Sequence, residues 1–225
     1  MNCQQMTPKP LTRSTLRTPK AAAIAGIAFS VLLIAVFWLL RTSIPADPQE
    51  PGAWLRSNSG FVALALNVLP FAGIAFLWFI GVLRDRLGDL EDRFFSTVFF
   101  GSALLFLAML FVAAALVGGI LIAFAKTPEA LIGSASFQIA RAAAYNLVNV
   151  YMVKMASVFM IATSTVARHT GIVPRWLTFT GFALAYVVLF GSFYISWSFL
   201  VFPTWVFLIS ASFLKDGRRR AEGNG

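Results

Sequence analysis

Long apolar stretches without a charged residue constrain the fold of this chain more than any other feature. Three of them cover residues 21–40, 60–83 and 94–125. A helix needs about 20 apolar residues to cross roughly 30 Å of hydrocarbon at about 1.5 Å per residue. Hydrophobic residues make up 59% of the chain and charged residues 12%, against about 45–50% and about 25% in soluble domains. The sequence therefore predicts an all-α, polytopic membrane helix bundle.

Six membrane-spanning helices are expected, and this number depends on the last apolar region. Residues 176–214 would form a helix of about 58 Å if they were continuous, almost twice the thickness that has to be crossed. The polar residues between 191 and 198, followed by Pro203, divide this region into two shorter helices. The expected spans are residues 21–40, 60–83, 94–125, 138–167, 176–193 and 199–214, which form one domain (21–214) between a basic N-terminal tail (1–20) and a basic C-terminal tail (215–225).

The positions of lysine and arginine predict the orientation of the bundle. With six spans both termini lie on one side, which collects 13 cations, whereas Arg41, Arg56 and Lys126 lie on the other side. The positive-inside rule places the side with 13 cations in the cytoplasm. A five-span alternative would move four C-terminal cations outside and weaken this bias. The net charge of +9 is concentrated on the cytoplasmic ends, where anionic membrane lipids are expected as partners and nucleic acid is not.

The segments on either side of the first span complete the expected layout. The 20 residues before it are mostly polar and no small-residue cleavage motif follows it, so this span is expected to be retained rather than removed as a signal peptide. The first external loop, residues 41–59, contains Pro45, Pro48 and Pro51. Such a composition predicts an extended, poorly packed segment.

The sequence contains no recognisable catalytic or metal-binding constellation. His169 is the sole histidine and Cys3 the sole cysteine, which argues against a His/Cys metal site and a Cys–His nucleophile pair. All nine acidic residues lie outside the expected spans, which argues against carriers that depend on an intramembrane acid. We therefore expect a non-enzymatic protein without a cofactor or a metal ion.

The fourth expected span contains two cations that need an explanation. Arg141 lies near its external end and Lys154 near its middle. A cation at the bilayer centre costs about 2.5–3.5 kcal/mol even on a lenient insertion scale. Both side chains are therefore expected to point into the bundle or into a water-filled cavity. No acidic residue of this chain is expected at that depth, which leaves backbone carbonyls, a neutral lysine, an anionic ligand or lipid, or a carboxylate from another subunit.

Other polar residues of the same span extend this candidate site. At 100° per residue, Arg141, Tyr145, Asn149 and Met152 share one helical stripe. Asn146 and Lys154 lie about 80° apart on a neighbouring face. The predicted site for a ligand or a partner comprises Arg141, Tyr145, Asn146, Asn149 and Lys154.

Two short sequences carry a resemblance to a known type of protein. The second loop contains LRDRL at residues 83–87, and the fifth span opens with VPRWL at residues 173–177. With six spans in about 220 residues and a basic stretch before the first, the chain resembles six-span bacterial membrane proteins of unknown function, common in actinobacteria. The resemblance implies a multi-pass protein of the bacterial cytoplasmic (inner) membrane. It implies no chemistry.

The function expected from these observations is a non-enzymatic one. The first hypothesis is an accessory or structural membrane subunit that binds lipid or a partner membrane protein. The alternative is a small carrier or channel-like protein for an anionic or amphipathic solute, centred on Lys154 in the fourth span. A lipid-modifying enzyme is a third class, for which the sequence lacks a polar cluster.

Overall fold

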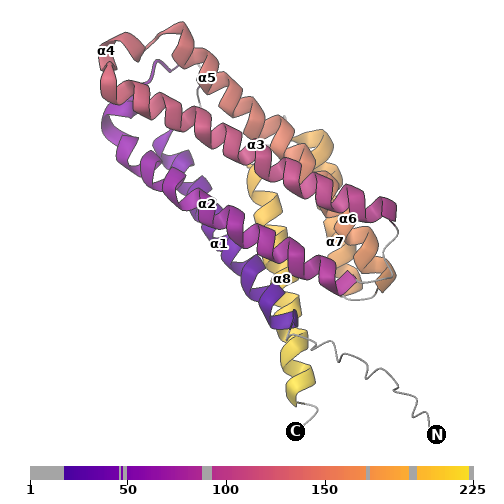
Figure 1. Ribbon diagram of the computed structural model, residues 1–225. Coiled ribbons are helices and arrows are strands. Elements are labelled where there is room, and N and C mark those ends of the chain that lie inside the picture. The colour runs from indigo at the N-terminus through magenta and orange to yellow at the C-terminus, as the bar shows by residue number, and fades with distance from the viewer. Residues whose placement is uncertain are drawn as a thin grey trace, which may run out of the picture.

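The computed structural model describes residues 18–45, 47, 50–87, 93–170, 173–192 and 197–222. Every regular element in these residues is a helix, which confirms the all-α class (Figure 1). The elements are α1 (Thr18–Ser43), α2 (Trp54–Leu87), α3 (Arg93–Lys126), α4 (Pro128–Leu131), α5 (Ala135–Asn146), the π-helix η2 (Leu147–Met152), α6 (Val153–Thr170), α7 (Arg175–Gly191) and α8 (Ser198–Glu222).

Several of these helices have the length and composition of membrane spans. In the described part of the chain there are five, namely Ala21–Ser43, Trp54–Arg84, Thr97–Lys126, Ala135–His169 and Ser198–Lys215. α7 is also apolar but has 17 residues. A chain with this many long apolar helices has the character of a multi-pass membrane protein.

The long helices lie side by side and form two groups (Figure 1). α1 packs most extensively on α2 and α8. α3 packs on α5, η2 and α6, and α6 packs on α7. α2 and α3 contact each other less extensively, so the two groups meet along a looser boundary.

α8 runs antiparallel to α1. The guanidinium of Arg41, at the end of α1, lies 5.5 Å from the ring centroid of Trp197, which directly precedes α8. Nearer the other end of both helices, Gly26 lies so close to Ser210 that an added Cβ would overlap the serine hydroxyl. The beginning of α1 and the end of α8 therefore lie at the same end of the bundle (Figure 1).

Five phenylalanines from five different helices meet in the centre of the core. They are Phe29 (α1), Phe76 (α2), Phe106 (α3), Phe159 (α6) and Phe202 (α8), and all are buried. Neighbouring rings have centroids 4.5–6.4 Å apart, mostly in edge-to-face geometry. Such pairs contribute about 0.5–1.5 kcal/mol each beyond the burial of their area. The cluster therefore joins the two groups of helices at one level of the bundle.

Candidate functional site

A cavity of about 400 Å³ lies between the two groups of helices. Its lining residues come from α1, α2, α3, α5, η2 and α8 and from the loop that follows α1. They are mostly Leu, Ile, Val, Ala and Phe. Small-molecule sites are typically about 300–1,000 Å³ in volume and predominantly apolar. The cavity thus has the size and the lining of a ligand site.

The cavity extends from one end of the bundle towards its centre. Trp54 and Ile120 belong to a small apolar cluster at that end, whereas Leu69 and Leu110 belong to the central core. From Trp54 to Leu69 the rise along α2 is about 22 Å. The neighbours of Arg41 in the sequence pack against the cluster that contains Trp54, so Arg41 also lies at this end. The space is elongated, with a polar mouth and an apolar floor.

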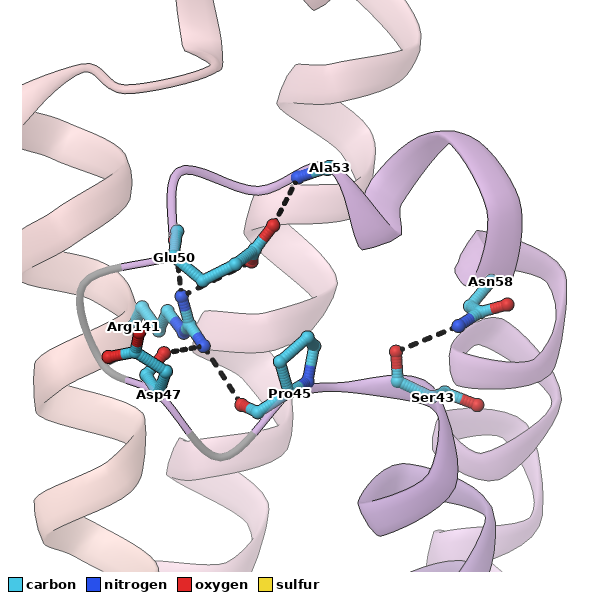
Figure 2. A network of polar contacts seen from close by, with 7 residues as sticks. All are labelled: Ser43, Pro45, Asp47, Glu50, Ala53, Asn58 and Arg141. Carbon is cyan, nitrogen blue, oxygen red and sulfur yellow. Dashed lines mark hydrogen bonds and ion pairs between the residues drawn. The ribbon is translucent and has the colours of Figure 1, made fainter.

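Arg141 (α5) lines the cavity, and its guanidinium is bound by the loop between α1 and α2. It donates hydrogen bonds to the backbone carbonyls of Pro45 (2.9 Å), Asp47 (2.6 Å) and Glu50 (Figure 2). Its Nη1 also lies 3.6 Å from Oε2 of Glu50, with side chains 11% and 20% exposed. The expectation that no acidic residue reaches the cations of the fourth span is therefore wrong for Arg141.

The first external loop is also better packed than its composition predicts. Besides the Arg141 contacts, the Glu50 carboxylate accepts a hydrogen bond from the Ala53 amide at 2.7 Å, and Nδ2 of Asn58 donates to the Ser43 carbonyl at 3.1 Å (Figure 2). The physical reason is that a proline has no N–H, so a proline-rich loop cannot satisfy its own carbonyls. Arginine, which has five N–H donors in a fixed fork, supplies what the loop lacks.

Two other donors at the mouth of the cavity have no acceptor. The recorded contact of the Arg41 guanidinium is the Trp197 ring, and no other described residue forms a hydrogen bond or an ion pair with it. Trp54 lines the cavity with 4% of its surface exposed, and its buried Nε1 has no hydrogen-bond partner among the described residues. A buried N–H without a partner costs about 1–3 kcal/mol.

Tyr145, Asn146 and Asn149 line the cavity beside Arg141. Nδ2 of Asn149 donates to the Tyr145 carbonyl at 3.0 Å. Tyr145 is 54% exposed, and Asn146 and Ala142 are exposed as well. Lining residues that are also exposed mark an opening, so the cavity opens on the flank of the bundle along α5.

The single helical stripe predicted from Arg141 to Met152 is broken by η2. A π-helical turn contains one residue more than an α-helical turn, so the residues after η2 are rotated back by about 100° relative to an unbroken α-helix. Met152 is consequently buried in the central core instead of sharing a face with Tyr145. No feature of the sequence alone signals this π-helix.

Lys154 does not belong to the cavity. It is exposed and is not among the lining residues, and no hydrogen bond or ion pair to it is recorded in the described part of the chain. The expectation that it points into the bundle is therefore wrong. The reason is that α6 presents Ala156, Phe159 and Thr163 to the core, and Lys154 lies on the opposite face.

The structure thus brings four of the five predicted site residues to one cavity and leaves Lys154 outside it. It adds Arg41, which the charge count places on the external side, and Trp54, to which the sequence pattern assigns no role in a site. The signal that could have indicated them is their position in the first external loop, on the same side as the external end of the fourth span. Among the described residues, no group of three or more His, Cys, Asp or Glu could hold a metal ion.

Comparisons with known proteins give no relative from which a function could be inferred. No family model matches the sequence, and neither the curated proteins nor the solved structures gave a significant match. The resemblance to six-span bacterial membrane proteins therefore stays a prediction, and the function has to be argued from the chain itself.

Proposed function

We propose that this chain is a six-span protein of the bacterial cytoplasmic membrane, with both termini in the cytoplasm, and that it binds a lipid-like amphiphile in its cavity. The antiparallel contact of α8 with α1 supports an even number of spans. α7 supplies the sixth span if its 17 residues cross at little tilt, since they rise by about 25 Å. The concentration of lysine and arginine at the termini supports the orientation.

The observation that carries the proposed function is the elongated apolar cavity that opens on the flank of the bundle beside two arginines. In a bilayer such an opening faces lipid, and an apolar space is filled more favourably by a hydrocarbon chain than by water. In the described part of the chain, the lining residues include no His, Cys, Asp, Glu, Ser or Thr. This supports binding rather than bond-making chemistry.

The test is native mass spectrometry of the protein extracted into nanodiscs, with a cavity-filling variant beside the wild type. Ala113 (α3) is buried and lines the cavity, so Ala113→Leu fills space that is otherwise open. We expect the wild type to retain one lipid-like molecule and Ala113→Leu to fold but lose it. The control is Ala103→Leu on the same helix, which is buried outside the cavity. Absence of any bound amphiphile in the wild type, with none taken up on addition, would overturn the proposal.

A second candidate function, that of a subunit docked to another membrane protein, is favoured by the outward face of α6. Lys154, Val158, Thr165 and Arg168 follow one another at helical spacing, and each is at least partly exposed. An unpaired cation near the middle of a span is costly, so a carboxylate from a neighbouring helix would stabilise it. The acidic residues of this chain all lie outside its spans, which points to a different protein as the partner.

Co-purification from the source membrane tests this second candidate. A partner bound through Lys154 should be lost in Lys154→Met and retained in Lys154→Arg, which keeps the charge. Lys126→Met is the control, because Lys126 is an exposed cation at the end of α3. Equal recovery of a partner with all three variants would remove the α6 face from consideration. The carrier hypothesis centred on Lys154 has less support, since Lys154 lies outside the cavity.

A further inference from the structure

We infer that the cavity selects an amphiphile with an anionic oxygen head group, bound by Arg41 and Trp54 at the mouth, with its chain towards Leu69 and Leu110. This inference rests on the proposed function, because it names the ligand class of the same cavity. The candidate head-group site is formed by the end of α1 and the start of α2.

The charged residues at the mouth favour an anionic ligand. Among the described residues that line the cavity, two are charged, both are arginines, and none is a carboxylate. Arg141 is neutralised by Glu50 and donates to three carbonyls of the loop. Arg41 has no recorded hydrogen bond or ion pair with a described residue, so its guanidinium is open to an anionic group. An anionic head group is favoured at this charge over a neutral or cationic one.

Two donors at the mouth have no acceptor among the described residues. The Arg41 guanidinium lies 5.5 Å from the centroid of the Trp197 ring, a cation–π contact that occupies none of its N–H groups with a hydrogen bond. Trp54 is part of the same cavity wall, and its indole N–H is buried and has no hydrogen-bond partner among the described residues. An oxyanion at the mouth would accept hydrogen bonds from both groups. It would also remove the cost of the unpaired indole N–H.

The apolar part of the cavity suits a hydrocarbon chain. The lining residues of α2 extend from Trp54 to Leu69, a rise of about 22 Å along the helix, and the walls are mostly Leu, Val and Ala. The ends of this space therefore differ in the same way as the ends of a single-chain amphiphile. A free phosphate ion would satisfy the donors and leave the apolar floor empty, whereas an alcohol of the same chain length would fill the floor and leave the donors unpaired.

The experiment compares probes that separate head group from chain, added to the purified protein in phosphatidylcholine nanodiscs. Hexadecyl phosphate, hexadecanoic acid, hexadecanol and inorganic phosphate are titrated, and binding is followed by native mass spectrometry and by thermal stability. We expect the two acids to bind at least about tenfold tighter than hexadecanol, equivalent to about 1.4 kcal/mol, and inorganic phosphate not to bind. The tighter of the two acids identifies the oxyanion as phosphate or carboxylate.

Matched variants assign the effect to the named donors. Arg41→Gln should weaken the acids at least about tenfold and leave hexadecanol unchanged, whereas Arg41→Lys should keep most of the preference. Trp54→Phe, which removes the N–H and keeps a ring, should weaken the acids without lowering the stability of the unliganded protein. The controls are Arg56→Gln, an exposed cation outside the cavity, and Trp78→Phe, an exposed tryptophan on the same helix as Trp54.

The outcomes separate failure of this inference from failure of the proposed function. Hexadecanol binding as tightly as the acids, or Arg56→Gln weakening the acids as much as Arg41→Gln, would overturn the anionic head group and leave an amphiphile site standing. Binding of inorganic phosphate alone, without competition from hexadecanol, would also overturn the inference. If none of the three chain-bearing probes binds, the proposed function itself fails.

Discussion

Replacing Arg141 by methionine should release the loop between α1 and α2 without unfolding the bundle. The substitution removes the hydrogen bonds to the Pro45, Asp47 and Glu50 carbonyls together with the ion pair to the Glu50 carboxylate. It keeps a side chain of similar length that can still cover the cavity wall. Because the loop contributes little to the central core, the effect is expected to be local rather than global.

The magnitude follows from the number and burial of these contacts. A hydrogen bond to a charged group contributes about 1.5–3 kcal/mol, and breaking a buried ion pair costs about 3–5 kcal/mol. The contacts share one side chain and are not additive. The Glu50 side chain is 20% exposed, so water reduces the cost of leaving its carboxylate without the arginine. We therefore expect a loss of about 3 kcal/mol in the free energy of loop opening, which raises the open population roughly a hundredfold.

Hydrogen–deuterium exchange of a peptide covering residues 44–53 measures this population. Exchange in that peptide should accelerate strongly in Arg141→Met, including at the Ala53 amide, whose acceptor is the Glu50 carboxylate. Glu50→Gln should give an intermediate effect, since it removes the ion pair and keeps the three carbonyl contacts. Arg56→Met is the control, because the Arg56–Glu129 pair is 60% and 87% exposed and contributes little. Exchange in Arg141→Met within twofold of the wild type would show that Arg141 does not hold the loop closed.

Three further predictions concern packing and topology. Gly181→Ala would place a Cβ 2.7 Å from Nε1 of Trp205 and should lower the free energy of unfolding by about 1–3 kcal/mol. Gly101→Ala, where an added Cβ meets no atom within 4 Å, should be neutral or stabilising. Thermal unfolding compares the two variants. Phe76→Ala should cost about 3–5 kcal/mol, measured by unfolding in mixed micelles, because Phe76 contacts four other rings of the central cluster. A cysteine at Lys215, in a background without the native cysteine, should react with a membrane-impermeant maleimide from the cytoplasmic side, and reaction from outside would contradict six spans.

The helices could be predicted from the sequence because their signal is composition over a long window. Residues 94–125 contain no charge, and α3 covers all of them. The structure of the first external loop could not be predicted in this way. Its prolines indicate the absence of helix, but its packing depends on Arg141, which lies about 90 residues away in the chain. The pairing was recognisable in principle, since both partners were expected at the external side of the membrane.

The candidate site could be predicted only in part, because composition identifies unusual residues but not their surroundings. Polar residues are rare in a span, so Tyr145, Asn146 and Asn149 were recognisable as unusual before their surroundings were known. Arg41 and Trp54 were not, because arginine and tryptophan at the ends of spans commonly act as interface anchors. What distinguishes these two residues is the absence of an acceptor for their N–H groups among the described residues and their position at a cavity, and both properties belong to the tertiary structure.

A buried environment is expected for both cations of the fourth span, and within this chain only Arg141 has one. Arg141 is 11% exposed and has a carboxylate and three carbonyls around it, so its charge is stabilised by the protein alone. Lys154 is subject to the same cost and has no recorded partner among the described residues. Lys154 lies 13 residues after Arg141 in the same expected span, which places it about 20 Å further from the external end. No described residue supplies the stabilisation that Lys154 lacks, and this is the physical reason to test the outward face of α6 for a partner with an acidic residue.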